Sequence, residues 1–217
     1  WRADSATISA PAFRDDGAVT SLTLSLGSEE SAFVVFGDEG ATTRAQPAEG
    51  LMVRATLNDD WRVTFQADRG ASAGTTLDAL RSLSESPDPG IRYFSGLSTY
   101  ERTFRLSSAD LRGQRVFLDL GAVGDIAEVR LNGKPVGTSW QAPHQLDITD
   151  VARPGRNDLT IRVANLWINR LIGDAQAGAK PVASTTISTY RADAPLRPSG
   201  LIGPVRLLTT RQGSRSR

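Results

Sequence analysis

The chain has 217 residues, one histidine and no cysteine, and its 25 basic residues nearly balance its 24 acidic residues. This length fits one large domain or two small ones, and it is sufficient to bury a core without disulfides. Because cysteine is absent, a disulfide framework and a thiolate metal site are both excluded. The interspersed charges form no basic stripe, so we predict no nucleic-acid partner. No run of about 18 apolar residues predicts a membrane-spanning helix.

Apolar and polar residues alternate along the first third of the chain, a pattern typical of half-buried strands. The alternation runs through residues 22–26, 51–57 and 61–65. Residues 58–60, Asn-Asp-Asp, separate the last two runs and predict the turn of a hairpin. The chain opens at Trp1 without an initiator methionine or a signal peptide, which predicts that it belongs to a longer protein.

One segment, residues 77–83, predicts a helix. Its leucines recur at spacing three, Thr75 or Thr76 can cap it, and two prolines at 87 and 89 end it.

Alternation returns in the second half, through residues 116–120, 127–131 and 159–163. Asn132-Gly133 supplies the two positive-φ positions of a type I′ turn, which is the best short-range signal for a hairpin. The inward-facing positions predict one shared core: Leu118, Leu120, Val129, Leu131, Leu159, Ile161, Val163 and Val205.

Many short strands with almost no helix predict an all-β fold, an antiparallel β-sandwich or jelly roll preceded by a smaller β unit. We place strands of a preceding β-sandwich domain in residues 1–74 and the main jelly roll in residues 75–210. Residues 211–217 form a basic tail, which we expect to be disordered.

No complete catalytic or metal site is recognisable in the sequence. His144 has neither a second histidine nor a cysteine with which to bind zinc. A glycosidase requires two facing carboxylates, and the spacing of the acidic residues selects no pair. We therefore predict no catalytic residues and no cofactor, while a structural calcium ion stays an open alternative.

Three clusters combine aromatic and polar residues: 92–96, 140–144 and 165–174. Aromatic faces stack on sugar rings, and amides, carboxylates and arginines orient sugar hydroxyls. The alternative is that Trp140 and Trp167 are core or interdomain aromatics. The candidate carbohydrate-binding residues are Trp140, His144, Asn165, Trp167, Asn169, Arg170 and Asp174.

A series of segments in one order carries a resemblance to a known family. They are the YFSG at 93–96, YERTF at 100–104, LDLG at 118–121, AEVRLNGKPVG at 127–137, DIT at 147–149, PGRN at 154–157, NLWINRLIGD at 165–174 and SGLIGPV at 199–205. Together they resemble the C-terminal galactose-binding-like jelly roll of α-L-rhamnosidase-type enzymes, glycoside hydrolase family 106. They are also similar to the sugar-binding domain of family 2 β-galactosidases and glucuronidases. Residues 31–36 resemble the last strand of the β-domain that precedes it.

The resemblance implies a non-catalytic accessory domain that supports or borders the substrate cleft of a glycoside hydrolase, with weak glycan contact. Its implied partners are a glycan or polysaccharide substrate and the catalytic barrel domain of the parent chain, with no membrane partner. Its implied location is secreted or periplasmic. The alternatives are a purely structural interdomain module without a ligand and a free-standing lectin-like carbohydrate-binding protein.

Overall fold

The computed structural model describes residues 1, 8, 10–24, 26, 30–37, 50–187 and 189–210. It contains fourteen strands within these residues, along with three short α-helices and one 3-10 helix, η1. The strands are β1 Phe13–Asp15, β2 Thr20–Leu22, β3 Leu51–Thr56, β4 Trp61–Phe65, β5 Gly74–Leu77, β6 Gly96–Leu106, β7 Val116–Asp119, β8 Ala122–Val123, β9 Ile126–Leu131, β10 Lys134–Ser139, β11 Gln145–Asp147, β12 Gly155–Asn165, β13 Leu201–Gly203 and β14 Arg206–Thr210. The helices are η1 Leu83–Glu85, α1 Pro89–Arg92, α2 Ser108–Leu111 and α3 Ile168–Asp174.

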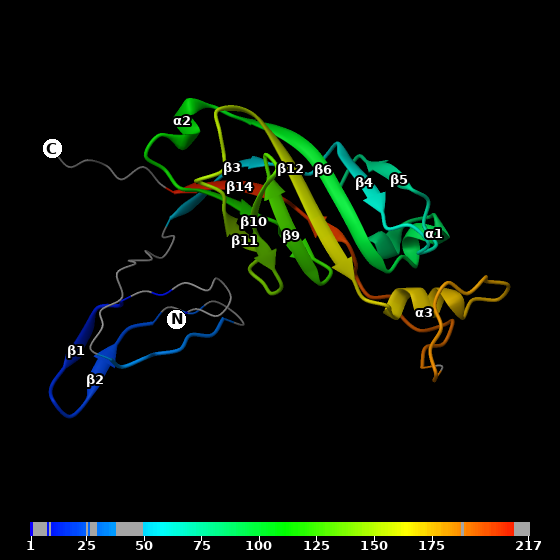
Figure 1. The fold of residues 1–217 in the computed structure, drawn as a ribbon, viewed down its shortest axis with the longest axis horizontal. Coiled ribbons are helices and arrows are strands. Elements are labelled where there is room, and N and C mark those ends of the chain that lie inside the picture. Colours follow the sequence, from blue (N-terminus) through cyan, green and yellow to red (C-terminus); the bar gives the residue numbers. More distant parts are fainter. Residues whose placement is uncertain are drawn as a thin grey trace.

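Two antiparallel sheets form the body of the molecule (Figure 1). The larger has six strands in the order β10-β9-β12-β6-β4-β5, and the smaller has four in the order β11-β7-β14-β3. Two further pairs, β1-β2 and β13-β8, stand outside them. The all-β, antiparallel sandwich predicted from the sequence is confirmed.

The core lies between these two sheets. All eight core residues expected from the alternation are buried in one cluster, so that prediction is confirmed. Trp61 and Tyr100 are its largest members, with ring centroids 6.4 Å apart in an edge-to-face arrangement. The hydroxyl of Tyr100 accepts a hydrogen bond from the backbone N–H of Leu201 at 3.1 Å. This bond ties the start of β13 to the core.

The expected hairpin at Asn132-Gly133 is confirmed, because φ is +53° at Asn132 and +76° at Gly133 and the turn joins β9 to β10. The prediction of a hairpin at residues 58–60 is wrong. β3 pairs with β14 and β4 pairs with β6 and β5, so the chain passes from one sheet to the other at this turn. The backbone N–H of Leu57 donates to Val205 O at 2.7 Å and anchors the crossing.

This pairing also corrects the start of the sandwich. Residue 75 was expected to open the main domain, but β3 and β4 are strands of its two sheets, which therefore include residues from Leu51 onward. β1 and β2 pair only with each other and lie away from the body in Figure 1. Assignment of the first residues to a preceding domain stays a prediction. The basic tail at 211–217 lies outside the described residues.

The helix expected at residues 77–83 is absent, because Leu77 ends β5 and Leu83 begins η1. The backbone N–H of Leu80 donates to Asn58 O and that of Leu83 to Ser199 O, at 3.1 and 2.9 Å. These long-range bonds satisfy the backbone without a helix. The strand that the resemblance implies at residues 31–36 is also absent, because residues 33–37 are irregular and Phe33 to Phe36 are exposed.

Candidate functional site

Strand register brings the predicted site segments to one end of the six-stranded sheet. The last residue of β12, Asn165, pairs with the first residue of β6, Gly96. Ser139 at the end of β10 pairs with Ala127, which in turn pairs with Val163. Residues 140–144 and α3 therefore leave the sheet at the same end. We call this end, made of residues 66–73, 93–96, 124–125, 140–144 and 165–174, the rim. Figure 1 shows α3 beyond the point of the β12 arrow.

Asn165 fastens three backbone segments at the rim. Its Nδ2 donates to Gly96 O at 3.0 Å and to Ser98 Oγ at 3.1 Å. Its Oδ1 accepts from the N–H of Gly200 at 2.6 Å. The side chain is buried, and both ends of its amide are engaged within the protein. Asn165 therefore supports the rim and offers no group to a ligand.

Asn169 has a similar role about one helical turn further along the chain. Its Nδ2 donates to Arg197 O at 2.8 Å, and its Oδ1 accepts from the N–H of Arg197 at 2.9 Å. These two reciprocal bonds have the pattern of a residue pair in an antiparallel β-sheet, and they hold the backbone at Arg197 against α3. Asn169 is 3% exposed, so its amide is committed to the fold.

Arg170 and Asp174 form a buried ion pair one helical turn apart on α3. Arg170 Nε lies 2.9 Å from Asp174 Oδ1, and both side chains are less than 10% exposed. The two atoms are not aligned as a hydrogen bond, so the contact is an ion pair. Asp174 Oδ2 also accepts from the N–H of Ala183 at 2.8 Å. Asn165, Asn169 and the Arg170–Asp174 pair thus form three separate sets of bonds.

The helix itself lies close against the segment before β6. A Cβ on Gly173 would come within 2.5 Å of Tyr93 Cβ, so only glycine fits there. The sequence predicts a helix at residues 77–83 and none at residues 168–174. In the structure Trp167 precedes the first turn of α3 and makes no side-chain capping bond, so the usual signal for a helix start is missing.

Trp167 stands at the edge of the rim and is 42% exposed. The guanidinium of Arg69 lies 4.7 Å from the centroid of its ring, a cation–π contact that fixes one face. Both backbone polar groups of its neighbour Leu166 are hydrogen-bonded to side chains. Its N–H donates to Asp125 Oδ2 at 3.2 Å, and its carbonyl accepts from Ser95 Oγ at 2.5 Å.

Trp140 and His144 differ from each other in exposure. Trp140 is 53% exposed, whereas His144 is 7% exposed. Nδ1 of His144 lies 2.8 Å from Ser139 Oγ. The backbone carbonyl of His144 accepts a hydrogen bond from the N–H of Leu120 at 2.9 Å. Burial lowers the pKa of His144, and the nearby negative charge of Asp119 opposes that shift. A buried, neutral imidazole here supports the loop between β10 and β11.

Of the seven predicted site residues, the structure leaves Trp140 and Trp167 with broad solvent-facing surfaces. Four others, His144, Asn165, Asn169 and Arg170, are buried. Arg69 and Arg197 were missed, because their partners lie far away in the sequence. No local pattern could have paired Arg69 with Trp167, or Arg197 with Asp125 at 3.6 Å.

Among the described residues, no group of three or more His, Asp or Glu side chains is arranged to hold a metal ion. No helix in the same stretches of chain is long and apolar enough to cross a membrane.

Comparison with known proteins identifies the kind of domain. Residues 94–194 match the family described as "Glycosyl hydrolase 2 galactose-binding domain-like". This region of the chain is thus similar to a galactose-binding-like domain of the type associated with glycoside hydrolases. The match covers β6 through α3, including most of the rim.

Two homologues extend the likeness over most of the chain. A rhamnosidase from Novosphingobium sp. PP1Y is 50% identical, with a TM-score of 0.82, and the match covers 92% of this chain and 19% of that one. A putative beta-glucuronidase from Formosa agariphila is 38% identical, over 77% of this chain and 16% of the relative. The chain thus spans less than a fifth of the length of either protein.

A beta-glucuronidase from an uncultured Clostridium sp. shares the fold at 23% identity, with a TM-score of 0.55 over 76% of this chain and 30% of that one.

Proposed function

We propose that this chain is a non-catalytic accessory module of an α-L-rhamnosidase-type glycoside hydrolase of family 106. Its partners would be the catalytic barrel domain of the parent chain and the glycan substrate, in a secreted or periplasmic protein. The observation that carries the proposal is the 50% identity to the Novosphingobium rhamnosidase, over 92% of this chain but only 19% of that enzyme. A segment so small relative to the enzyme fits one module of it.

The bonding of the rim carboxylates supports a non-catalytic role. Hydrolysis of a glycosidic bond requires one carboxyl group to donate a proton and a second to act as base or nucleophile. Asp125 accepts from the N–H of Leu166 and faces Arg197. Asp174 is paired with Arg170 and accepts from the N–H of Ala183. Both carboxylates are thus engaged by arginines and backbone N–H groups of this chain.

The exposure of the two rim tryptophans supports a weak contact with glycan. Trp140 and Trp167 present aromatic surface to solvent at the same end of the sheet. Aromatic surface of this kind can stack on the C–H face of a sugar ring. The remaining predicted residues, His144, Asn165, Asn169, Arg170 and Asp174, would act by holding the rim in shape.

A second candidate is a structural interdomain module without a ligand. Ile126 and Leu166 are 45% and 49% exposed and lie at the same sheet end as the two tryptophans. Contiguous exposed apolar surface is typical of contacts with another domain. A free-standing lectin-like protein is the third alternative, and it is less compatible with homologues that are several times longer.

Tryptophan fluorescence of the 217-residue chain, titrated with rhamnose-containing oligosaccharides, tests the proposal. We expect a saturable change that Trp167→Ala abolishes while the circular dichroism spectrum is retained. Trp1→Phe is the matched control, because Trp1 is 59% exposed and lies outside both large sheets. A Trp167→Ala variant with unchanged sugar affinity and a lower Tm would instead support the structural module.

A further inference from the structure

A second concave site lies away from the rim tryptophans, between β5, η1 and α1. The hollow has a volume of about 330 Å³. That value falls at the small end of the range for small-molecule sites, roughly 300–1,000 Å³. We call it the β5 hollow. It is lined in part by Leu77, Leu83 and Ile91, and Leu83 and Ile91 are at most 8% exposed. The hollow therefore has a fixed apolar floor.

Three of the polar residues that line the hollow are Arg81, Ser86 and Asp88. Asp88 uses Oδ1 to accept from the N–H of Gly90 at 2.7 Å, and no described residue bonds to its second oxygen. Ser86 Oγ accepts from the N–H of Asp88 at 3.2 Å, which leaves its own hydrogen free to donate. Arg81 makes no hydrogen bond or ion pair with the described part of the chain. Each of the three groups thus retains hydrogen-bonding capacity for a ligand.

The charges of the hollow select the class of ligand. Arg81 and Asp88 carry opposite charges, so the lining favours neither an anion nor a cation as a whole. A carboxylate accepts hydrogen bonds and a guanidinium donates them, whereas a sugar hydroxyl does both. The apolar floor suits the C–H face of a pyranose ring.

We propose that the β5 hollow binds a single uncharged pyranose unit, with Leu77, Leu83 and Ile91 under the ring and Arg81, Ser86 and Asp88 on its hydroxyls. Without an aromatic side chain in the lining, binding is weak and rests on these polar groups. The site is separate from the rim tryptophans and does not depend on their proposed role.

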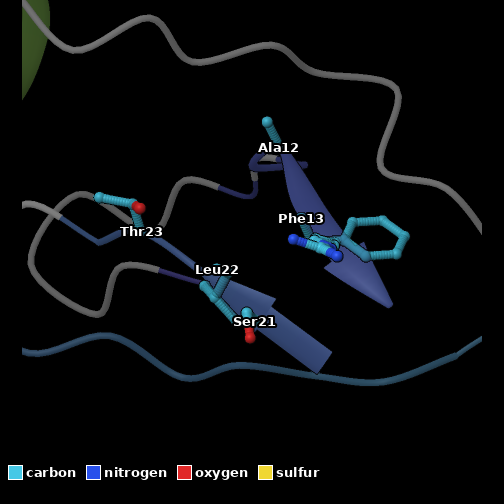
Figure 2. Close-up of a pocket in the computed structure, with 6 residues that line it drawn as sticks. Ala12, Phe13, Ser21, Leu22 and Thr23 are labelled. Atoms are coloured by element: carbon cyan, nitrogen blue, oxygen red, sulfur yellow. The ribbon is translucent and has the colours of Figure 1, made fainter. Parts of the chain in front are cut away.

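The other hollow of similar volume lies on the β1-β2 ribbon and is a poorer candidate. Figure 2 shows its lining, with Ala12 and Phe13 from one side and Ser21, Leu22 and Thr23 from the other. Phe13, Ser21 and Leu22 belong to two short strands that pair only with each other, and Ala12 and Thr23 flank these strands. An isolated two-stranded ribbon is marginally stable, so it supplies no rigid walls.

The test is a titration of the ¹⁵N-labelled 217-residue chain, followed by the amide NMR spectrum. The probes are L-rhamnose and D-galactose as neutral pyranoses and D-glucuronate as a charged one. We expect at least one neutral sugar to shift the amides of Ser86, Asp88 and Gly90 saturably. Arg81→Ala should weaken that affinity at least tenfold. Asp88→Asn should weaken it several-fold while retaining the cap of α1, since asparagine caps helices as well as aspartate does.

Arg112→Ala is the matched control, because Arg112 is exposed and without a described partner at α2, which Figure 1 shows at the opposite end of the body from α1. It should leave the sugar affinity unchanged. Three results would overturn the proposal: neither neutral sugar shifts these amides, Arg81→Ala and Asp88→Asn both retain full affinity, or D-glucuronate binds more tightly than both neutral sugars. Shifts confined to the amides around Trp167 are a case of the first of these results, and they would support glycan contact at the rim instead.

Discussion

Apolar and polar residues alternate both in the sandwich body and in the first 37 residues. The alternation coincides with burial of the apolar side chains in the body, whereas several described apolar side chains of the first 37 residues are exposed. In β12, alternation places Leu159, Ile161 and Val163 in the core at no more than 1% exposure. Leu24, in a similar alternating run, is 43% exposed, and Phe33 is 62% exposed. β12 has β6 and β9 on its two sides and a second sheet beneath it, whereas β1 and β2 have only each other. Alternation thus selects a face of a strand, but a second layer is needed to bury that face.

The largest effect that tests this contrast is a cavity in the body. Ile161→Ala should lower the free energy of unfolding by about 3 kcal/mol, because the side chain is fully buried between the sheets. Leu24→Ala should change it by less than about 0.5 kcal/mol. Urea unfolding of the three proteins measures both values. Equal losses in the two variants would show that the first residues fold cooperatively with the body.

A somewhat smaller effect is expected at the buried ion pair of α3. Asp174→Asn leaves the charge of Arg170 without its partner, so we expect a loss of about 2 kcal/mol. Asp193→Asn is the control, because its pair with Arg191 is more than 70% exposed on both sides. Such exposed pairs contribute about 0–1 kcal/mol. If both substitutions cost the same, the α3 pair is solvated in solution.

A pH-dependent effect is expected where β3 joins the body. A hydrogen bond from Arg54 and others from Ser107 lower the pKa of Asp110 to about 2, although burial opposes the shift. The unfolded carboxyl group has a pKa of about 3.9. The folded pKa is therefore the lower one, so the stabilisation is complete above about pH 5 and is lost progressively as the pH falls toward 2.

Because Arg54 is half exposed, solvent screens the pair, and we expect a contribution of about 1 kcal/mol. Denaturant unfolding of wild type and Asp110→Asn at several pH values between 6 and 2.5 measures it. The difference between the two proteins should shrink below pH 4. A constant difference across that range would show that the pKa of Asp110 is the same in the folded and unfolded protein, which would contradict this account.

Several features were predictable from local sequence because their causes are local. The turn at Asn132-Gly133 needs only two residues that tolerate positive φ. The core positions of β7, β9 and β12 follow from alternation alone. The failures have distant causes. Residues 58–60 have the composition of a hairpin turn, but the strands on either side are taken by β14 and β6. The spacing of Leu77, Leu80 and Leu83 suits a helix, yet Asn58 and Ser199 accept the backbone bonds instead.

The rim shows the same division. Its residue types were recognisable, because tryptophan, amide and charged residues follow the end of a predicted strand. Their bonding was not, since Asn165 bonds to Gly96 and Gly200, and Asn169 to Arg197. A buried amide that holds a backbone and an exposed amide that holds a sugar have the same sequence signature. Only the three-dimensional positions of the partners separate the two roles.

The most direct test of the proposed role is a hydrolysis assay with the purified 217-residue chain and aryl α-L-rhamnosides. Asp125 and Asp174, two carboxylates of the rim, are engaged by arginines and backbone N–H groups in the described part of the chain. We predict no hydrolysis above the rate without protein. Cleavage that disappears on substitution of one carboxylate of this chain, such as Asp125→Asn, would contradict the account.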